Sequence, residues 1–328
     1  MSLLSQKLSL RTATMKNRIA MPPMANRIAT EDGAVVPTLL HHYTDRAKEQ
    51  IALVIVEHSY VHPLGKASKG QLAIDKDELV QGLTTLASSI KEQGALSAIQ
   101  ITHAGSKTTA ELIGQAPAGP SAVGNPSAGD TPREFTESEL AELKECYVKA
   151  ALRAQKAGFD AVEIHGAHGY LLNQFLSPLT NKRTDEYGGS EEARAKFPLE
   201  VVSAVKEAID ENTLLMYRLG VDDLLPGGLT IDATVRFSTL LEKNGIDLID
   251  ISGGIMGYSI VDEKPGYFGT HGKAIKQQVS IPVMVTGGVK TPELAEEMLL
   301  AGDADIVGVG RALLKNPRWA REAIEKLL

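Results

Sequence analysis

Eight short apolar runs follow one another along the chain, and most of them are rich in β-branched residues. Runs of this kind are typical of parallel strands that are buried on both faces. Stretches with helical periodicity lie between them, so strands and helices alternate. This alternation predicts an α/β fold, a TIM (β/α)8 barrel formed as a single domain by residues 1–328, and it fits a doubly wound sheet less well. The predicted strands cover residues 17–21, 51–56, 96–101, 159–164, 214–219, 246–251, 282–285 and 305–309.

The helical stretches between these runs have recognisable ends. Apolar residues repeat on one face of residues 137–157, with Thr136 as a candidate cap and Glu139 placed to complete a capping box. Ser190 precedes two glutamates and is expected to cap the helix that follows the fourth strand.

Two connections are too long to be simple links between a strand and a helix. They cover residues 105–133 after the third strand and residues 253–272 after the sixth. Loops of this length inside a compact domain are usually functional. Because both follow strands, we expect both to overhang the face of the barrel where active sites are found.

Composition narrows the class of protein further. No apolar run approaches the ~20 residues of a membrane span, and the N-terminus lacks the apolar core of a signal peptide. Cys146 is the only cysteine, which excludes an intramolecular disulfide, a four-cysteine zinc site and a protein-held iron–sulfur cluster. The net charge of −7 disfavours a nucleic-acid partner. We therefore expect a soluble cytoplasmic protein with neither a nucleic-acid nor a membrane partner.

Two histidines and a tyrosine follow the fourth predicted strand within six residues: His165, His168 and Tyr170. Their spacing is compatible with a metal site, but no nearby carboxylate or cysteine completes a ligand set, so we predict no metal. A purely structural role is the simpler alternative. Two imidazoles beside a phenol can also hold a carbonyl oxygen on which negative charge develops and deliver a proton to a neighbouring carbon.

Glycine-rich turns after the last two strands predict a phosphate site. Gly287 and Gly288 follow the seventh strand, while Gly310 and Arg311 follow the eighth. Barrels commonly bind phosphate there, because bare backbone amides at a helix start favour an anion. The alternative is that these glycines only make tight turns.

Polar side chains near the ends of three other strands fit a large planar ligand. They are His58, Gln100 and Arg218. Such a ligand needs donors that point into the barrel. Arg218 lies between apolar residues, so it is either a ligand donor or the buried partner of a carboxylate; its position at a strand end favours the ligand.

Several separate motifs now agree in order and position, and together they resemble the Old Yellow Enzyme family of FMN-dependent ene-reductases. The resemblance extends over nearly the whole chain. The motifs lie at residues 16–19, 23–24, 100–105, 165–178, 183–190 and 308–311.

The resemblance implies a TIM barrel with non-covalent FMN that is reduced by NADH or NADPH and then reduces an activated alkene, a small molecule. His165 and His168 would bind the substrate carbonyl, hydride would pass from flavin N5 to the β-carbon, and Tyr170 would protonate the α-carbon. The flavin carries the redox chemistry. The residues that would contact the ring are Pro23, Met24, Ala25, His58, Gln100, His165 and Arg218, and those that would bind the phosphate are Gly287, Gly288, Gly310 and Arg311.

The chain departs from the family pattern on one side of the pocket. Where the family usually places a threonine or cysteine that contacts the flavin carbonyl, this chain has Ala25. An aromatic residue that is often found near the substrate is also missing, and Asn26, Arg27 and Ile28 stand there instead. The pocket is therefore expected to be more polar and to have a different shape.

Two other functions stay open at this level. One is an aldolase or isomerase that uses the phosphate site for a phosphorylated sugar, although such an enzyme would want a lysine or a carboxylate base at a strand end. The other is a non-catalytic flavin-binding sensor. The family resemblance also makes a homo-oligomer plausible.

Overall fold

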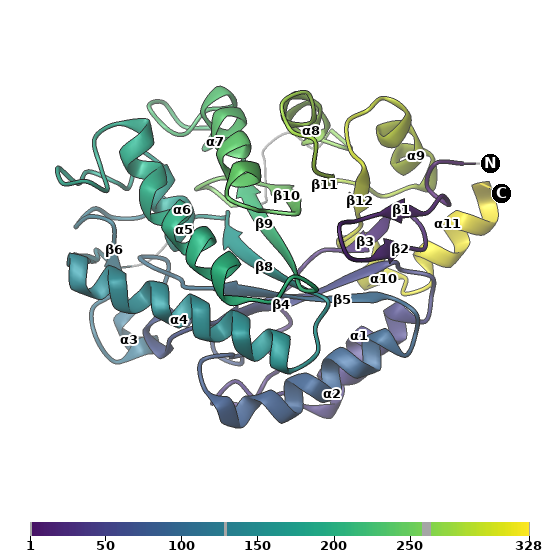
Figure 1. The fold of residues 1–328 in the computed structure, drawn as a ribbon, viewed down its shortest axis with the longest axis horizontal. Coiled ribbons are helices and arrows are strands. Elements are labelled where there is room, and N and C mark those ends of the chain that lie inside the picture. Colours follow the sequence, from purple (N-terminus) through teal and green to yellow (C-terminus); the bar gives the residue numbers. More distant parts are fainter. Residues whose placement is uncertain (1, 128–129, 258–263, 328) are drawn as a thin grey trace.

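The computed structural model describes residues 2–127, 130–257 and 264–327, and its centre is a closed barrel of eight parallel strands (Figure 1). Each predicted strand supplies one strand of the barrel, so the predicted fold class is confirmed. The last barrel strand pairs with the first, which closes the sheet and leaves no edge strand exposed. The strands are β3 (Ile19–Met21), β4 (Leu53–Tyr60), β5 (Leu96–Thr102), β8 (Ala161–Gly166), β9 (Leu214–Gly220), β10 (Leu248–Ser252), β11 (Val283–Thr286) and β12 (Ile306–Gly308).

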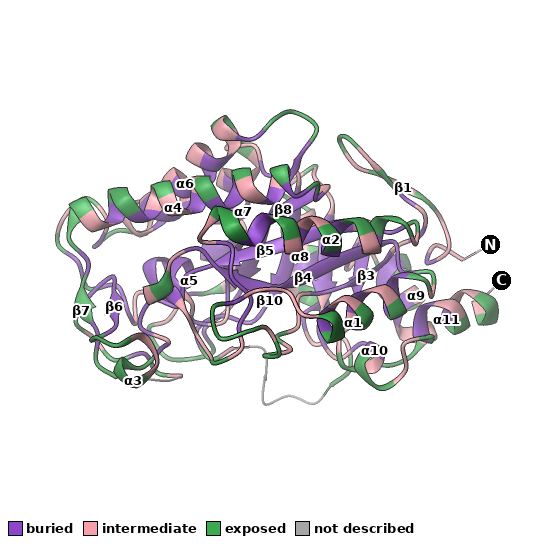
Figure 2. Ribbon diagram, turned by 90° about the horizontal axis from the view of Figure 1, so that it is seen from below, coloured by how far each residue is buried: buried purple, intermediate pink, exposed green. Residues whose placement is uncertain are grey.

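The helices surround this barrel, and the long ones bury one face and expose the other (Figure 2), whereas the short α5 (Leu171–Leu176) is buried throughout. Thr136 and Glu139 form the predicted capping box, and Ser190 accepts a hydrogen bond from the Ala193 N–H at the start of its helix. The helices are α1 (Pro37–Ala47), α2 (Val80–Lys91), α3 (Ala110–Ile113), α4 (Glu137–Lys156), α5 (Leu171–Leu176), α6 (Glu191–Ala208), α7 (Ile231–Lys243), α8 (Gly269–Lys276), α9 (Pro292–Leu300), α10 (Arg311–Lys315) and α11 (Trp319–Leu327), with short 3-10 turns at Pro63–Gly65 and Asp77–Leu79.

A two-stranded antiparallel hairpin near the N-terminus was not predicted from the sequence. Its strands are β1 (Leu8–Ser9) and β2 (Thr14–Met15). Met15 is fully buried and belongs to the same apolar cluster as the residues that fill the barrel interior at its amino end, such as Leu53 and Met216. The hairpin therefore covers the end of the barrel opposite the candidate site.

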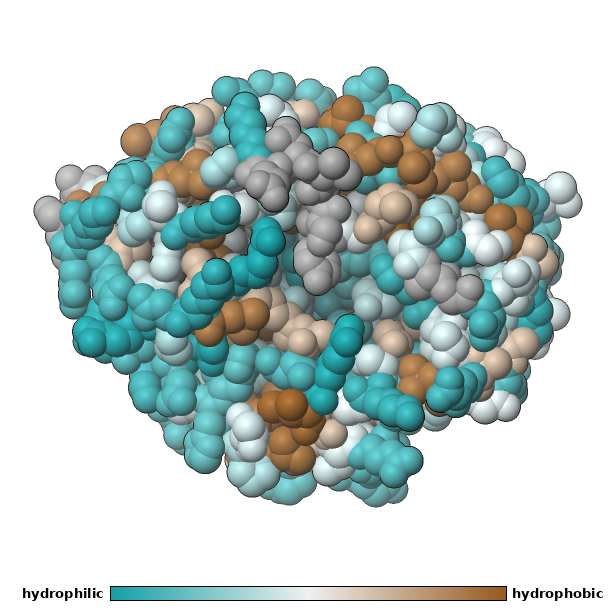
Figure 3. Space-filling view, turned by 180° about the vertical axis from the view of Figure 1, so that it is seen from behind, coloured by the Kyte–Doolittle hydropathy of each residue, from teal (hydrophilic) through white to brown (hydrophobic). Residues whose placement is uncertain are grey.

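The two long connections differ in what the structure shows. The first contains α3 and a short parallel pair, β6 (Ala118–Gly119) and β7 (Arg133–Glu134), and reaches the segment after β8, as expected. In the second, residues 258–263 lie outside the described part of the chain. In Figure 3 one face of the molecule is hollowed near its middle, and hydrophilic side chains are prominent around the hollow. Across the described ranges, no helix combines the length and the apolar character needed to cross a membrane.

Candidate functional site

Polar side chains replace apolar ones along the strands toward the carboxyl end of the barrel. Side chains two residues apart on a strand point to the same face. On β9, the interior residue Met216 is followed two positions later by Arg218. On β8, Ala161 is followed in the same way by Glu163 and then His165. An apolar layer is thus succeeded by a polar layer and then by the histidine.

The polar layer is made of two buried pairs. Gln100 Nε2 donates to Glu163 Oε2 at 2.6 Å. Arg218 Nε lies 3.3 Å from Asp250 Oδ2, so this arginine is the buried partner of a carboxylate. Burial raises the pKa of Glu163 and of Asp250, and the Arg218 guanidinium lowers both.

The hydrogen bonds that Arg218 makes to described residues are all long. Nη1 donates to the Pro23 carbonyl and Nη2 to Ser252 Oγ, each at 3.4 Å. Nε is buried, lies near Asp250 and makes no hydrogen bond of good geometry within the described residues. Since a buried guanidinium normally makes shorter, charge-assisted bonds, it has donor capacity to spare for a planar ligand.

Four aromatic side chains meet above the polar layer. The ring centre of His165 lies 5.1 Å from that of His168 and 4.9 Å from that of Tyr170. The His58 ring lies 5.2 Å from Tyr170 and 6.2 Å from His165. The structure therefore brings together all three predicted catalytic residues and one further predicted cofactor contact, His58.

The histidines of this cluster are neutral. Burial is the main cause that lowers the pKa of His165, of His168 and of His58, in the last case to about 4. Nδ1 of His165 accepts a hydrogen bond from the Ala167 N–H at 3.3 Å, so the ring proton is on Nε2. His168 Nε2 lies 2.6 Å from Ser252 Oγ. A neutral imidazole that keeps one N–H is a donor for a ligand oxygen.

His168 is held in a backbone conformation that only its surroundings stabilise. Its φ is 59°, in the left-handed region, which is uncommon for a residue with a Cβ. Its N–H donates to the Gly253 carbonyl at 3.0 Å, and its carbonyl accepts from Lys107 Nζ at 2.6 Å. Strain of this kind is characteristic of functional sites.

Three supporting residues were not assigned a role from the sequence. Lys107 also lies 5.4 Å from the centre of the Tyr170 ring. Asn125 Nδ2 and Gln174 Nε2 both donate to the Gly169 carbonyl, at 3.0 and 2.6 Å. All three bind backbone carbonyls, a contact that leaves no spacing signal in a sequence.

The predicted phosphate turns lie side by side, because Thr286 on β11 pairs with Gly308 on β12. Packing alone requires Gly287, since a Cβ there would lie 2.7 Å from the Tyr267 ring, and Gly288 has a φ of 67°. Gly310 is different: a Cβ would meet nothing closer than Met24 Sδ at 3.3 Å. It caps α10, whose first residue is the exposed Arg311. The tight-turn explanation therefore holds for the first pair and leaves Gly310 and Arg311 available to a ligand.

The segment after β3 supplies the remaining predicted contacts. Pro23 and Met24 are half-buried and Ala25 is exposed. The Asn26 N–H donates to the carboxylate of Glu57, which precedes His58 on β4. Burial raises the pKa of Glu57 to about 7. This segment thus lies against the strand that carries His58.

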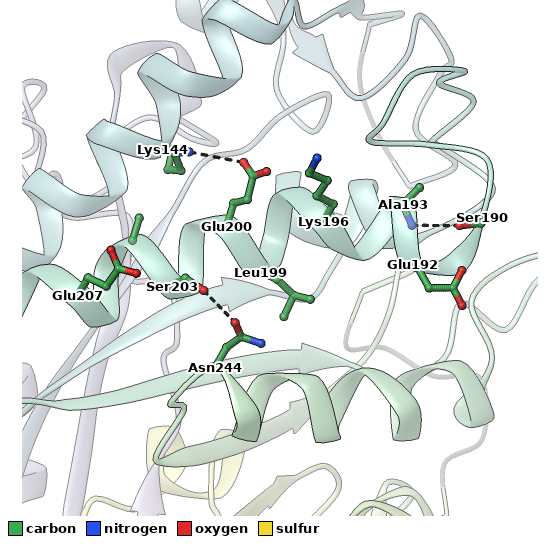
Figure 4. Close-up of a pocket in the computed structure, with 11 residues that line it drawn as sticks. Lys144, Ser190, Glu192, Ala193, Lys196, Leu199, Glu200, Ser203, Glu207 and Asn244 are labelled. Carbon is green, nitrogen blue, oxygen red and sulfur yellow. Dashed lines mark hydrogen bonds and ion pairs between the residues drawn. The ribbon is translucent and has the colours of Figure 1, made fainter.

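Two hollows elsewhere on the molecule do not involve this cluster. A groove of about 780 Å³ between α4 and α6 is lined by residues such as Lys144, Glu200 and Ser203. Figure 4 shows the ion pair between Lys144 and Glu200 and the hydrogen bond from Ser203 to Asn244. A smaller cavity of about 300 Å³ is lined by His62, His103 and Cys146, among others. Neither contains a residue of the four-ring cluster.

Comparisons with known proteins identify the family. The model of the NADH:flavin oxidoreductase / NADH oxidase family matches residues 4–328. Over 95% of its length, the chain is 40% identical to an NADH oxidase from Thermoanaerobacter brockii, but it spans only 49% of that protein. It is also 39% identical to an NADPH dehydrogenase from Bacillus subtilis (strain 168), and it spans 94% of that protein.

Solved structures agree with this result. A 2-naphthoyl-CoA reductase in complex with 2-naphthoyl-CoA superimposes with a TM-score of 0.94 at 28% identity, over 99% of this chain and 52% of that one. Morphinone reductase in complex with tetrahydroNAD gives a TM-score of 0.87 at 28% identity, over 99% of this chain and 91% of that one. An old yellow enzyme homologue from Zymomonas mobilis gives a TM-score of 0.87 at 27% identity, over 99% of this chain and 93% of that one.

Proposed function

The chain belongs to the NADH:flavin oxidoreductase / NADH oxidase family, whose cofactor is FMN and whose reductant is NADH or NADPH, and we propose that it reduces the C=C bond of α,β-unsaturated carbonyl compounds or related activated alkenes. The observation that carries the proposal is the cluster of His165, His168 and Tyr170 at the carboxyl end of the barrel.

Each residue of the cluster has a distinct part in this reaction. His165 Nε2–H and the His168 ring bind the carbonyl oxygen and withdraw electron density from the double bond. Tyr170, whose ring contacts that of His165, donates its hydroxyl proton to the α-carbon. FMN, when bound, supplies the hydride that reaches the β-carbon. Both histidines are neutral, so they polarise the carbonyl by hydrogen bonds and the proton comes from the phenol.

The residues present fit FMN. Arg218 has unused donor capacity beneath the cluster, as its long hydrogen bonds indicate. With Gln100, it would bind the polar edge of the flavin ring, and Pro23, Met24, Ala25 and His58 would line the ring. Gly310 and Arg311, with Gly287 and Gly288 beside them, would take the phosphate.

The alternative reaction on the same scaffold lacks its base. An aldolase or isomerase would need a strand-end lysine or a free carboxylate. The strand carboxylates Glu57, Glu163 and Asp250 are engaged by the Asn26 N–H, by Gln100 and by Arg218. No observation therefore favours that function.

The test begins with the purified protein reconstituted with FMN. We expect a yellow protein that NADH or NADPH bleaches under nitrogen and that regains its colour on addition of 2-cyclohexenone. A panel of enones, nitroalkenes and unsaturated acids then defines the acceptor. A protein that cannot be reconstituted with FMN contradicts the proposal, and a protein that is bleached but recolours only with oxygen is the sensor-like alternative.

Ala25 provides a test of the flavin's position. Ala25→Cys or Ala25→Thr places a donor where the chain has a methyl group, and a donor near the ring favours the reduced, more negative flavin. One added hydrogen bond of about 0.5–1.5 kcal/mol corresponds to a rise in midpoint potential of about 10–30 mV for a two-electron couple. Redox titration of the FMN-loaded variants measures it, with Ala25→Val as the control without a donor. An unchanged potential with full FMN content means that residue 25 does not reach the ring.

A further inference from the structure

We propose that the alkene reduced by this enzyme carries a carboxylate, and that Arg27, at the carboxyl end of the barrel beside His58, binds that carboxylate. The inference rests on the proposed alkene reduction and adds the chemical class of its substrate. Arg27 belongs to the segment after β3 that departs from the family pattern, and its position, its free guanidinium and the charge around it all point to an anion.

The backbone holds Arg27 in a defined place beside β4. Its φ is 59°, in the left-handed region. The N–H of the preceding Asn26 donates to the Glu57 carboxylate. The Arg27 carbonyl packs closely on Gly70: a Cβ added to Gly70 would lie 2.3 Å from the carbonyl oxygen of Arg27. The Ala29 N–H returns a hydrogen bond to the Gly70 carbonyl at 3.0 Å. These contacts hold the backbone of Arg27 in an uncommon conformation, and they therefore define the position from which its side chain extends.

The guanidinium of Arg27 is available to a ligand. The side chain is exposed, and no other described residue engages it in a hydrogen bond or an ion pair. It nevertheless acts on the site, because after burial it is the strongest cause that lowers the pKa of His58, ahead of Arg218. His58 in turn contacts His165 and Tyr170. Because the Asn26 N–H binds Glu57, the residue before His58 on β4, Arg27 lies next to the strand that carries the ring adjoining the carbonyl-binding pair.

The charge around the cluster is positive. Besides burial, the cations that lower the pKa of His168 are Arg218 and Lys107, and both also lower the pKa of His165. Lys107 reaches the cluster through its hydrogen bond to the His168 carbonyl. A field of this sign draws an anion into the pocket and repels a cationic substrate.

Glu57, the carboxylate that binds the Asn26 backbone, does not neutralise Arg27. Glu57 accepts from the Asn26 N–H rather than from the guanidinium. Burial raises its pKa to about 7, so near neutral pH it is protonated in a large fraction of molecules. Asp250 offsets Arg218 within the polar layer below. Among the residues that the structure describes, Arg27 and Lys107 thus remain as the uncompensated charges on the substrate side.

A carboxylate is the group that best matches this arrangement. The planar guanidinium binds it with two parallel charge-assisted hydrogen bonds. A substrate with its carbonyl on His165 and His168 and a carboxylate at the other end of the double bond would pass over His58 to reach Arg27. The phosphates of the nicotinamide are a second source of negative charge, and the experiment separates the two.

The experiment compares (E)-4-oxopent-2-enoate with its methyl ester, which share the enone and differ only in the carboxylate. Loss of one charge-assisted contact worth about 1.4 kcal/mol is a tenfold effect. We expect Arg27→Gln to lower the ratio of kcat/KM for the acid to that for the ester about tenfold. Arg27→Lys keeps the charge but not the two parallel donors, so it should restore only part of the ratio. Arg318→Gln, at an exposed arginine just before the C-terminal helix, should leave the ratio as in the unaltered enzyme. The acid's kcat/KM, unlike the ester's, should also fall as salt is added.

A second measurement uses a ligand that cannot be reduced. Isothermal titration of the FMN-loaded protein with 4-oxopentanoate should give a Kd that rises about tenfold in Arg27→Gln. Equal losses of kcat/KM for the acid and the ester in Arg27→Gln would overturn the inference and leave alkene reduction intact. An effect confined to the rate at which NADPH bleaches the flavin would do the same. If neither alkene is reduced, alkene reduction fails, and the titration still decides whether Arg27 binds a carboxylate.

Discussion

Replacing Tyr170 by Phe should reduce alkene turnover by a factor of about 10²–10⁴ while the protein keeps its FMN, because this range is the usual contribution of a positioned general acid. The substitution removes one hydroxyl and keeps the ring that packs on His58 and His165. The measurement is steady-state consumption of NAD(P)H with 2-cyclohexenone under nitrogen.

A matched control separates proton transfer from general damage to the site. Tyr187→Phe removes a hydroxyl from a half-buried tyrosine that lies 3.4 Å from Glu200 and outside the cluster. Its turnover should stay within a factor of two or so of the unaltered enzyme, as expected for a surface change within about ±0.5 kcal/mol. Rapid bleaching by NAD(P)H in Tyr170→Phe, together with slow alkene reduction, would place the defect in the step with alkene. Unimpaired turnover would mean that another group donates the proton.

Arg218→Gln should destabilise the protein by about 3–5 kcal/mol, because it leaves the buried Asp250 carboxylate without its charged partner. It should also weaken FMN binding, since the guanidinium lies beneath the proposed flavin site. Urea unfolding followed by far-UV circular dichroism gives the free energy of unfolding, and titration with FMN gives the affinity.

The matched control is an exposed arginine in a comparable ion pair. Arg236→Gln breaks a 2.7 Å pair with Glu191 on the outside of the barrel, where solvent screens both charges, so the free energy of unfolding should stay close to that of the unaltered protein. Arg218→Lys keeps the charge and should recover part of the stability. If Arg218→Gln is as stable as Arg236→Gln, then Asp250 is neutral in the folded protein and the pair is not ionic.

The barrel could be predicted from the sequence because strands buried on both faces leave a local signal. Each predicted run supplied one barrel strand, although β4 continues past Val56 to Tyr60, through Glu57 and His58. The prediction stopped at the polar residues, whereas the strand keeps them because the interior of the barrel changes from apolar to polar along its axis. The short β1–β2 hairpin carries no such signal, since it is stabilised by packing against the barrel end.

The candidate site was predictable where function lies in residues close in sequence. His165, His168 and Tyr170 belong to one segment, so a strand end was enough to place them together. The pairs Gln100–Glu163 and Arg218–Asp250 depend on register between neighbouring strands, which a single sequence does not reveal. The left-handed backbone at His168 depends on contacts from other loops and was likewise hidden.

The position of a deuterium label in the product tests the proposed alkene reduction. FMN-loaded protein is incubated under nitrogen in D2O with NAD(P)H and 2-cyclohexenone, and the product is analysed by NMR. We expect cyclohexanone with one solvent deuterium at the α-carbon and hydrogen from the nicotinamide at the β-carbon. Consumption of NAD(P)H without any saturated ketone would exclude alkene reduction.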